Sequence, residues 1–110
     1  AKGNYVIVGA DWNQCPPEFP YDSFSSGNAD DYYQDNIAVD FMPEGWKWAF
    51  DPTVATNRKN TTKFELDKTF TTLIDFYLLS PNVILLEVEG VSLNFENSDH
   101  QPVKLKIQLK

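Results

Sequence analysis

The sequence is poor in cysteine and has no long apolar run. Cys15 is the only cysteine among the 110 residues. An intramolecular disulfide and a cysteine-rich zinc site are therefore excluded. No apolar stretch approaches the roughly 20 residues that a membrane-spanning helix needs, so we expect no membrane span. With 42% hydrophobic and 15% aromatic residues, the chain is still rich enough in apolar side chains to form a packed core.

Basic residues are also scarce. The chain has 9 lysines and arginines against 16 aspartates and glutamates, which gives a formal net charge of -7. Such a balance repels phosphate polyanions and provides no general electrostatic footprint for nucleic acid, although nucleic acid stays open as a substrate class. A cluster of carboxylates would instead attract a hard divalent cation.

Short apolar runs predict a chain built mainly from β-strands. Residues 5–8 are apolar and mostly β-branched, which predicts a fully buried strand that leads into Asp11. Residues 70–80 give the strongest strand signal, and Val103–Leu109 alternate with polar residues, which predicts a strand with one solvated face. Further strands are expected over residues 41–50, 83–88 and 91–95.

The remaining segments predict loops and one short helix. Residues 14–28 contain three prolines and a glycine, and residues 51–62 are polar, so both predict loops, the second one exposed. Asn28 or Asp30 would cap a short helix over residues 31–36. We therefore expect the α/β (α+β) class, with mainly one mixed or antiparallel sheet and a short helix in a single domain.

Acidic residues interrupt or end these apolar strands at three places. Asp11 ends the first run, Asp75 lies among large apolar neighbours, and Asp99 precedes His100, the only histidine. A carboxylate inside an apolar strand costs several kcal/mol unless a partner or a metal compensates it. Asp75 on a solvated sheet face and a solvated His100 are the ordinary alternatives. The reactive alternative is a carboxylate–imidazole pair that fixes the tautomer of the ring and acts on a phosphoryl group.

Three short motifs resemble those of the endonuclease/exonuclease/phosphatase (DNase-I-like) superfamily. Residues 9–13, Gly-Ala-Asp-Trp-Asn, are similar to its strand-end G-D-x-N motif. Residues 74–80 resemble its I-D-x-x-x-x-S strand, and residues 98–103 resemble its closing S-D-H-x-P-V. The three motifs follow the order and spacing of the family. Ala10 is a departure, because the family usually has glycine directly before the aspartate.

The resemblance implies a metal-dependent phosphoesterase that hydrolyses phosphate esters with an activated water. Asp11 would hold or deprotonate the water, and Asn13 would orient the phosphate. Asp75 would pair with His100, and His100 would contact the scissile phosphate. Asp99, together with Asp11, would lie at a divalent metal, Mg²⁺ or Mn²⁺, which acts as Lewis acid and template. Substrate contacts are expected from a loop that contains Asn57 and Arg58.

The resemblance also implies that residues 1–110 form the C-terminal part of one such domain. Family domains are roughly twice this length, and their N-terminal half brings a metal-binding glutamate. The expected fold is then half of a four-layered sandwich of two sheets. Metal would bind weakly and turnover would be very low without the other half. The uncovered sheet face should bind that N-terminal half or a second copy of the chain.

A non-catalytic, β-rich module that binds carbohydrate or another ligand is the alternative from a different class. An aromatic platform for sugar rings would use five residues of the chain: Trp12, Tyr32, Tyr33, Trp46 and Trp48. Core packing is the commoner fate of such side chains. This alternative leaves the three motifs unexplained.

Overall fold

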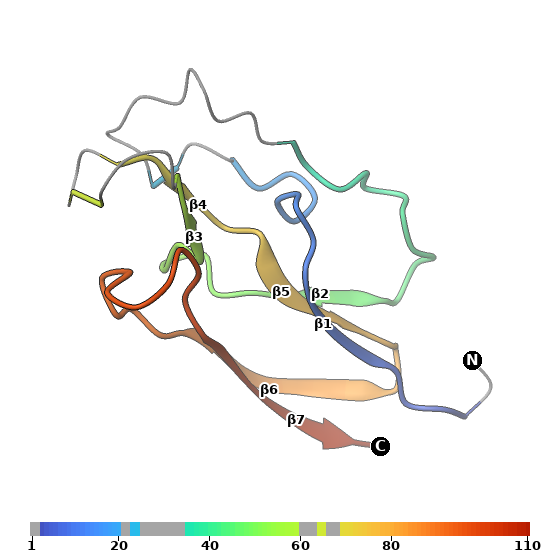
Figure 1. The fold of residues 1–110 in the computed structure, drawn as a ribbon. Helices are drawn as coiled ribbons and strands as arrows, with labels where there is room; N and C mark the ends of the chain where they lie inside the picture. Colours follow the sequence, from blue (N-terminus) through green and yellow to red (C-terminus); the bar gives the residue numbers. More distant parts are fainter. Residues whose placement is uncertain (1–2, 21–22, 25–34, 60–63, 66–68) are drawn as a thin grey trace.

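The computed structural model describes residues 3–20, 23–24, 35–59, 64–65 and 69–110 (Figure 1). Within these residues the chain is all-β. The strands are β1 (Ile7–Asp11), β2 (Lys47–Ala49), β3 (Asn57–Arg58), β4 (Thr71–Thr72), β5 (Asp75–Leu79), β6 (Val83–Gly90) and β7 (Val103–Leu109). They form three antiparallel sheets, with the orders β1-β5-β2, β3-β4 and β6-β7.

The predicted α/β (α+β) class is wrong for the described part of the chain, which contains no helix. The helix expected over residues 31–36 lies mostly outside the described residues. Its last two residues, Asp35 and Asn36, are extended instead, and Asn36 forms a β-bridge with Cys15. The expectation of mainly one sheet is also wrong, because the strands divide among three small sheets.

The three-stranded sheet has β5 at its centre. β1 and β2 flank β5, with Ile7 opposite Leu79 on one side and Lys47 opposite Leu79 on the other. The strand expected over residues 41–50 is thus reduced to its last part, Lys47–Ala49. β5 is the only strand of this sheet with two partners, and three of its five residues, Phe76, Leu78 and Leu79, are buried.

β1 is an exposed edge strand, so the prediction of a fully buried strand is wrong. All of its residues are exposed, with Ile7 at 44% and Val8 at 38%. An edge strand has a paired neighbour on one side only, and among the described residues that neighbour is β5. The β-branched apolar run therefore predicted the strand correctly but not its burial.

The apolar run 70–80 is divided between two sheets. Residues Thr71–Thr72 pair with β3, whereas Asp75–Leu79 pair with β1 and β2. At the break, the backbone N–H groups of Ile74 and Asp75 both donate to the hydroxyl oxygen of Thr56, at 3.0 and 3.1 Å. A side chain from a distant segment thus replaces strand partners at this point, which hydropathy alone cannot show.

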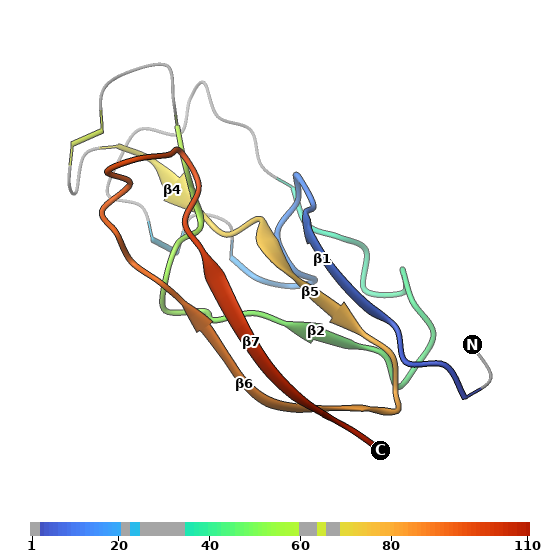
Figure 2. The same ribbon diagram turned by 60° about the horizontal axis from the view of Figure 1, so that its bottom comes forward.

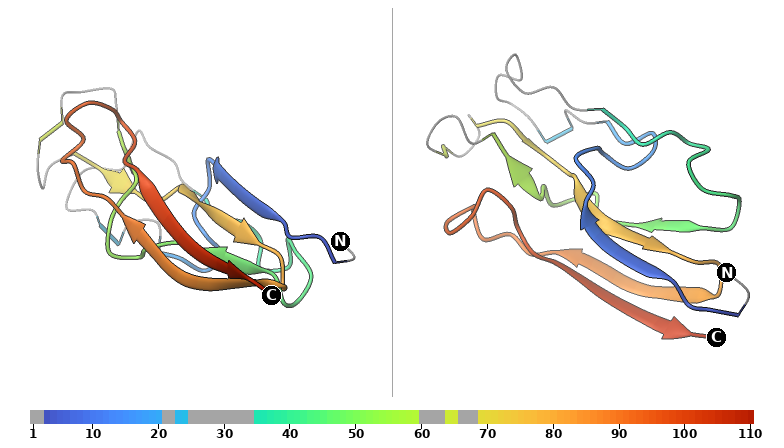
Figure 3. Two further views of the ribbon diagram at one scale, coloured as in Figure 1. Left: turned by 90° about the horizontal axis from the view of Figure 1, so that it is seen from below. Right: turned by 45° about the vertical axis from the view of Figure 1, so that its right-hand side comes forward.

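Two layers cover opposite faces of the β1-β5-β2 sheet. On one side lies the β6–β7 hairpin (Figures 2 and 3). Its Leu85 and Leu105 pack against the buried cluster of Ala49, Leu79 and Val83. The other side carries the larger aromatic cluster, in which Phe76 of β5 is the central ring. Trp12 is part of this cluster, since its ring stacks on Phe76 with centroids 5.7 Å apart and meets Trp48 edge-on at 5.1 Å.

The C-terminal hairpin follows its sequence pattern closely. β6 and β7 pair along their whole length, with one register shift between Leu85 and Glu87.

The strand predicted over residues 91–95 is absent, because this segment turns: Asn94 and Phe95 both have a positive φ, of 52° each. The turn is closed by Gln101, whose side-chain oxygen accepts from the N–H groups of Leu93 and Phe95.

Gly9 lies beneath the ring of Tyr77, its register partner on β5. A Cβ atom at this position would lie 2.6 Å from Cε1 of that ring. The ring is tethered, because its hydroxyl donates to the carbonyl of Val103 at 2.9 Å. We expect Gly9→Ala to lower the free energy of unfolding by about 1–3 kcal/mol through overpacking. Urea unfolding of the variant and the wild type checks this. An unchanged midpoint for Gly9→Ala would contradict it.

Candidate functional site

Two aspartates lie directly opposite each other at one end of the β1-β5-β2 sheet. In the antiparallel pairing of β1 with β5, Asp11 is the register partner of Asp75. Like charges in directly opposed positions destabilise a strand pair. Asp11 is exposed and Asp75 is half-buried, so solvent screens the second carboxylate less well. The pair therefore needs a compensating positive charge or hydrogen-bond donor.

His100 supplies that donor. Its Nδ1 lies 2.9 Å from Oδ2 of Asp75, and its Nε2 lies 3.7 Å from Oδ2 of Asp11. The pairing expected between Asp75 and His100 is thus present in the structure. The ring stands between the two carboxylates, with one nitrogen directed toward each. Asp75 and Asp11 are 25 and 89 residues from His100 in the sequence, so the three side chains meet only when the chain is folded.

The dipeptide Thr56–Asn57 holds both members of this pair. Thr56 is 2% exposed, and its hydroxyl oxygen accepts from the N–H of Asp75. Asn57 is 5% exposed, and its Nδ2 lies 3.0 Å from the carbonyl of Asp99 and 3.3 Å from Nε2 of His100. The prediction of an exposed loop over residues 51–62 is therefore wrong at its centre. Thr56 and Asn57 are buried there because their side chains form hydrogen bonds with Asp75, Asp99 and His100.

Backbone hydrogen bonds fix the segment that carries His100. The N–H of Gln101 donates to the carbonyl of Thr56 at 2.8 Å, and the N–H of Arg58 donates to the carbonyl of Asp99 at 3.0 Å. Asn57 and His100 form an antiparallel β-bridge. The segment therefore adds to the edge of β3 like a short third strand, which limits how far His100 can move.

The carboxylates control the protonation of the site. Burial raises the pKa of Asp75, the nearby charge of Asp11 raises it further, and hydrogen bonds from His100 and Thr56 offset part of this effect. Partial burial alone would lower the pKa of His100. The hydrogen bond to Asp75 and the charges of Asp75, Asp11 and Asp99 outweigh burial, so the pKa of His100 is raised above its usual value.

Other predicted site residues take different places. Asp99 is not in the cluster formed by Asp11, Asp75 and His100, although its charge acts on His100. Asn13 does not continue an extended strand from Asp11. It has a φ of 53°, and its N–H donates to Oδ1 of Asp11 at 2.9 Å. The roles predicted for both residues stay predictions.

Arg58 leaves β3 on the face opposite to Asn57, because successive side chains of a strand alternate. Its Nη1 donates to the carbonyl of Lys59 at 3.2 Å. Asn57, by contrast, contacts His100 directly. Sequence reasoning associated both residues with the substrate, and it missed Thr56, for which a polar stretch between two apolar runs gives no signal. The role predicted for Arg58 in substrate binding stays a prediction.

Asp11, Asp75 and His100 form a possible metal site. One ligand atom from each residue lies within 4.8 Å of the others, and Asp11 is on the solvent side of the group. Two carboxylates and an imidazole are donors that divalent cations accept. The opposed carboxylates also carry more negative charge than one imidazole can neutralise. The residues present therefore fit a divalent cation.

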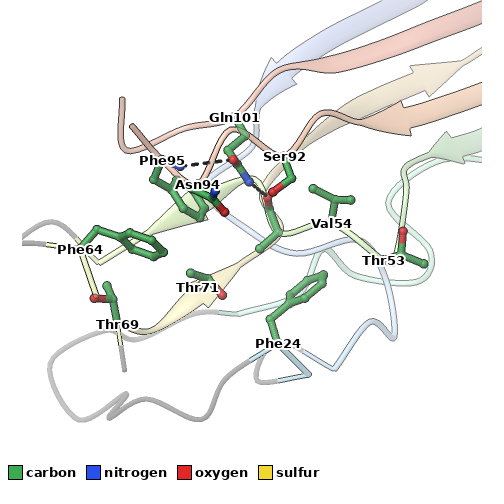
Figure 4. Close-up of a pocket in the computed structure, with 11 residues that line it drawn as sticks. Phe24, Thr53, Val54, Phe64, Thr69, Thr71, Ser92, Asn94, Phe95 and Gln101 are labelled. Carbon is green, nitrogen blue, oxygen red and sulfur yellow. Dashed lines mark hydrogen bonds between the residues drawn. The ribbon is translucent and has the colours of Figure 1, made fainter. Parts of the chain in front are cut away.

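One hollow reaches this cluster in the described part of the chain. It has a volume of about 330 Å³ and includes Ala10, Asp75 and Gln101 in its lining, so the Asp75 side of the cluster is open to small molecules. A second hollow, of about 220 Å³, is drawn in Figure 4; it is lined by Phe64, Phe95 and other uncharged residues and by no residue of the cluster. Because the second hollow has no cationic side chain, it offers a phosphate group no charge partner.

Comparisons with models of protein families, with curated proteins and with solved structures found no match to this chain. Within the described residues, no helix has the length and apolar character needed to cross a membrane.

Metal binding provides a direct test of the cluster. We expect Mn²⁺ or Mg²⁺ to raise the melting temperature, because a ligand that binds only the folded chain stabilises it by about 2.7 kcal/mol at a concentration 100 times its Kd. Asp11→Asn should remove most of this shift in differential scanning fluorimetry. Glu87→Gln, which removes an exposed carboxylate from β6, should keep it. Equal shifts in both variants would mean that the ions act through general charge screening.

Proposed function

We propose that this chain carries part of the active site of a metal-dependent phosphoesterase, which hydrolyses phosphodiesters or phosphomonoesters with an activated water. The observation that supports this most is the position of His100 between two opposed aspartates. Burying part of such a charged group away from solvent costs stability, so a purely structural role accounts poorly for it. Strongly coupled acids and bases in one cluster are typical of catalytic sites.

Each residue has a proposed role that its contacts support. Asp11, which is exposed, would orient the attacking water and accept its proton. His100 would stabilise the negative charge on the phosphoryl oxygens, and Asp75 would fix the orientation of its ring. Mg²⁺ or Mn²⁺, held by Asp11 with Asp75 or His100, would supply Lewis-acid and template chemistry. The backbone N–H of Asn13 donates a hydrogen bond to Oδ1 of Asp11, which restrains the carboxylate of Asp11.

The three motifs that resemble the endonuclease/exonuclease/phosphatase superfamily support the same proposal. Each motif contributes one residue to the cluster: Asp11, Asp75 and His100. The resemblance further implies a metal-binding glutamate from an N-terminal half. On this proposal, residues 1–110 alone turn over substrate very slowly, and the half with the glutamate restores activity.

A carbohydrate-binding platform gains no support from the aromatic residues. Trp12 and Trp48 pack against each other and against Phe76 in the core cluster. The Nε1 of Trp12 donates to the carbonyl of Phe76 at 2.9 Å, which fixes the ring inside the fold. Tyr32 and Tyr33 lie outside the described residues. We therefore propose the phosphoesterase alone.

A hydrolysis assay tests the proposal. The substrates are bis(p-nitrophenyl) phosphate and p-nitrophenyl phosphate, each with Mg²⁺, Mn²⁺ or EDTA. The chain of 110 residues is compared with a chain extended at its N-terminus, and Asp11→Asn is made in both. We expect metal-dependent turnover in the extended chain that Asp11→Asn lowers by a factor of at least about 100.

The matched control is Asp51→Asn. Asp51 is also an aspartate with several hydrogen bonds, since its carboxylate accepts from the N–H groups of Thr53 and Gly90, but it is not in the cluster. This variant should lose stability and keep its kcat when folded. Turnover that survives both EDTA and Asp11→Asn would refute the proposed site, and an extended chain without activity toward a wider panel of phosphate esters would refute the proposed function.

A further inference from the structure

We propose that the free edge of β1 binds a second copy of this chain, which adds its own β1 in antiparallel orientation across a two-fold axis. Among the described strands, only β5 pairs with β1. Figure 2 shows β1 on the side of β5 that is opposite to β2. All five residues of β1 are exposed, so this edge is open to a partner in the described part of the chain.

The backbone groups along this edge are available for pairing at alternate residues. The N–H of Trp12 donates to the carbonyl of Ile74, in register with the β1–β5 pairing, so the even-numbered residues here point their backbone groups toward β5. In an antiparallel ladder, the residues between them point theirs the other way. The N–H and carbonyl groups of Ile7, Gly9 and Asp11 therefore face the open edge, where a second strand can bond them.

The charge pattern of the strands favours an identical partner at this edge. Residues 5–10 contain no charged side chain, and Ile7 and Val8 are 44% and 38% exposed. β6 and β7 are also edge strands, but each carries two like charges at alternate positions. Charged side chains of this kind oppose the pairing of an edge with its own copy. Self-pairing is therefore opposed at the hairpin and unopposed at β1.

The side chains favour a two-fold axis at Val8. This axis sets Val8 opposite Val8 of the second copy, and a β-branched pair of this kind stabilises a strand pair. Since Val8 directs its backbone groups toward β5, the new pair is of the non-hydrogen-bonded type, in which side chains approach most closely. An axis at Gly9 would instead oppose two residues without side chains. With the axis at Val8, Asp11 of each copy lies opposite Tyr5, which is neutral.

The negative charge of the chain opposes this arrangement only weakly. The two Asp11 residues lie about 20 Å apart along the ladder, which exceeds the Debye length of about 8 Å at physiological ionic strength. The net charge of -7 on each copy should still weaken the dimer at low ionic strength. The paired stretch is short, so we expect a small interface and a Kd in the micromolar range. Pairing at β1 needs neither metal nor hydrolysis and is therefore independent of the proposed function.

Sedimentation velocity of the 110-residue chain, from low to high micromolar concentration, measures the association. We expect the wild type to shift from monomer to dimer and no further, because a two-fold pairing is closed. Val8→Lys sets two lysines opposite each other at the axis and should raise the Kd of the dimer at least about 10-fold. The matched control is Val39→Lys at a residue that is 68% exposed and outside β1, and it should dimerise like the wild type.

Amide hydrogen exchange followed by NMR locates the interface. The N–H groups of Ile7 and Gly9 face the open edge, so their protection should rise with protein concentration. Those of Val8 and Ala10 face β5 and should be protected at every concentration.

A wild type that stays monomeric throughout would overturn the proposal, and so would growth beyond the dimer. Equal association of Val8→Lys and the wild type, or loss of association in Val39→Lys, would place the interface elsewhere and overturn it as well. Protection of Ile7 and Gly9 in the monomer would mean that another segment of the chain covers the edge, which also contradicts it. If Val8→Lys does not fold, the wild-type association and the exchange pattern decide.

Discussion

Replacing His100 with alanine is expected to lower kcat/KM for phosphate-ester hydrolysis by about 10²–10⁴-fold in the extended chain. This is the range for a group that transfers a proton or stabilises charge in the transition state. The effect should be large because His100 is the only histidine and its ring is the group that joins the two aspartates. No neighbouring imidazole can replace it.

Combining Asp75→Asn with His100→Ala tests whether the two residues act as a pair. Alone, it should lower activity because the carboxylate that accepts from Nδ1 of His100 is lost. Added to His100→Ala, it should change activity little, because residues that act as a unit are strongly non-additive. A double-mutant cycle on kcat/KM measures this. Fully additive losses would show that Asp75 acts independently of His100 and would contradict the assigned pair.

Replacing Phe76 with alanine is expected to lower the free energy of unfolding by about 3–5 kcal/mol. Phe76 is 2% exposed and lies at the centre of the aromatic cluster. Its ring stacks on Trp12 with centroids 5.7 Å apart and meets Trp48 edge-on at 5.6 Å. The cavity left by the ring can shrink only if these large neighbours move, so most of the loss should remain.

Urea unfolding followed by circular dichroism measures the change, with Val39→Ala as the control. Val39 is 68% exposed, and its truncation should change stability by no more than about 0.5 kcal/mol. Similar midpoints for the two variants would contradict the assigned core.

The sequence predicts strands well where local pattern and local contacts agree. Val103–Leu109 alternates apolar and polar residues, and its partner β6 lies close before it in the chain, so the hairpin needs no distant information. The run 70–80 failed as one strand because Thr56, a residue of another segment, binds the N–H groups of Ile74 and Asp75. The same break separates the β3-β4 sheet from the β1-β5-β2 sheet, whereas β6 and β7 pair only with each other among the described strands. Local hydropathy does not record such remote hydrogen bonds.

The candidate site was predictable in part, from motifs and not from periodicity. The three motifs identified Asp11, Asp75 and His100, which lie together in the structure. They did not identify Thr56, and the resemblance gave Asn57 only as a substrate contact in an exposed loop, whereas both residues are buried. Buried polar residues without a pattern around them can be found only when their hydrogen-bond partners are known.

Two consecutive residues at the end of β1 connect the candidate site to the hydrophobic core, because their side chains point to opposite faces of the sheet. Asp11 faces the cluster, whereas the next residue, Trp12, enters the aromatic core and donates to the carbonyl of Phe76. A slip of one residue in the pairing of β1 with β5 would exchange these two side chains, placing a carboxylate among aromatic rings and an indole beside His100. A chain that pairs out of register therefore loses the packing of Trp12 on Phe76 and Trp48. The register that stabilises the core is thus also the register that assembles the site.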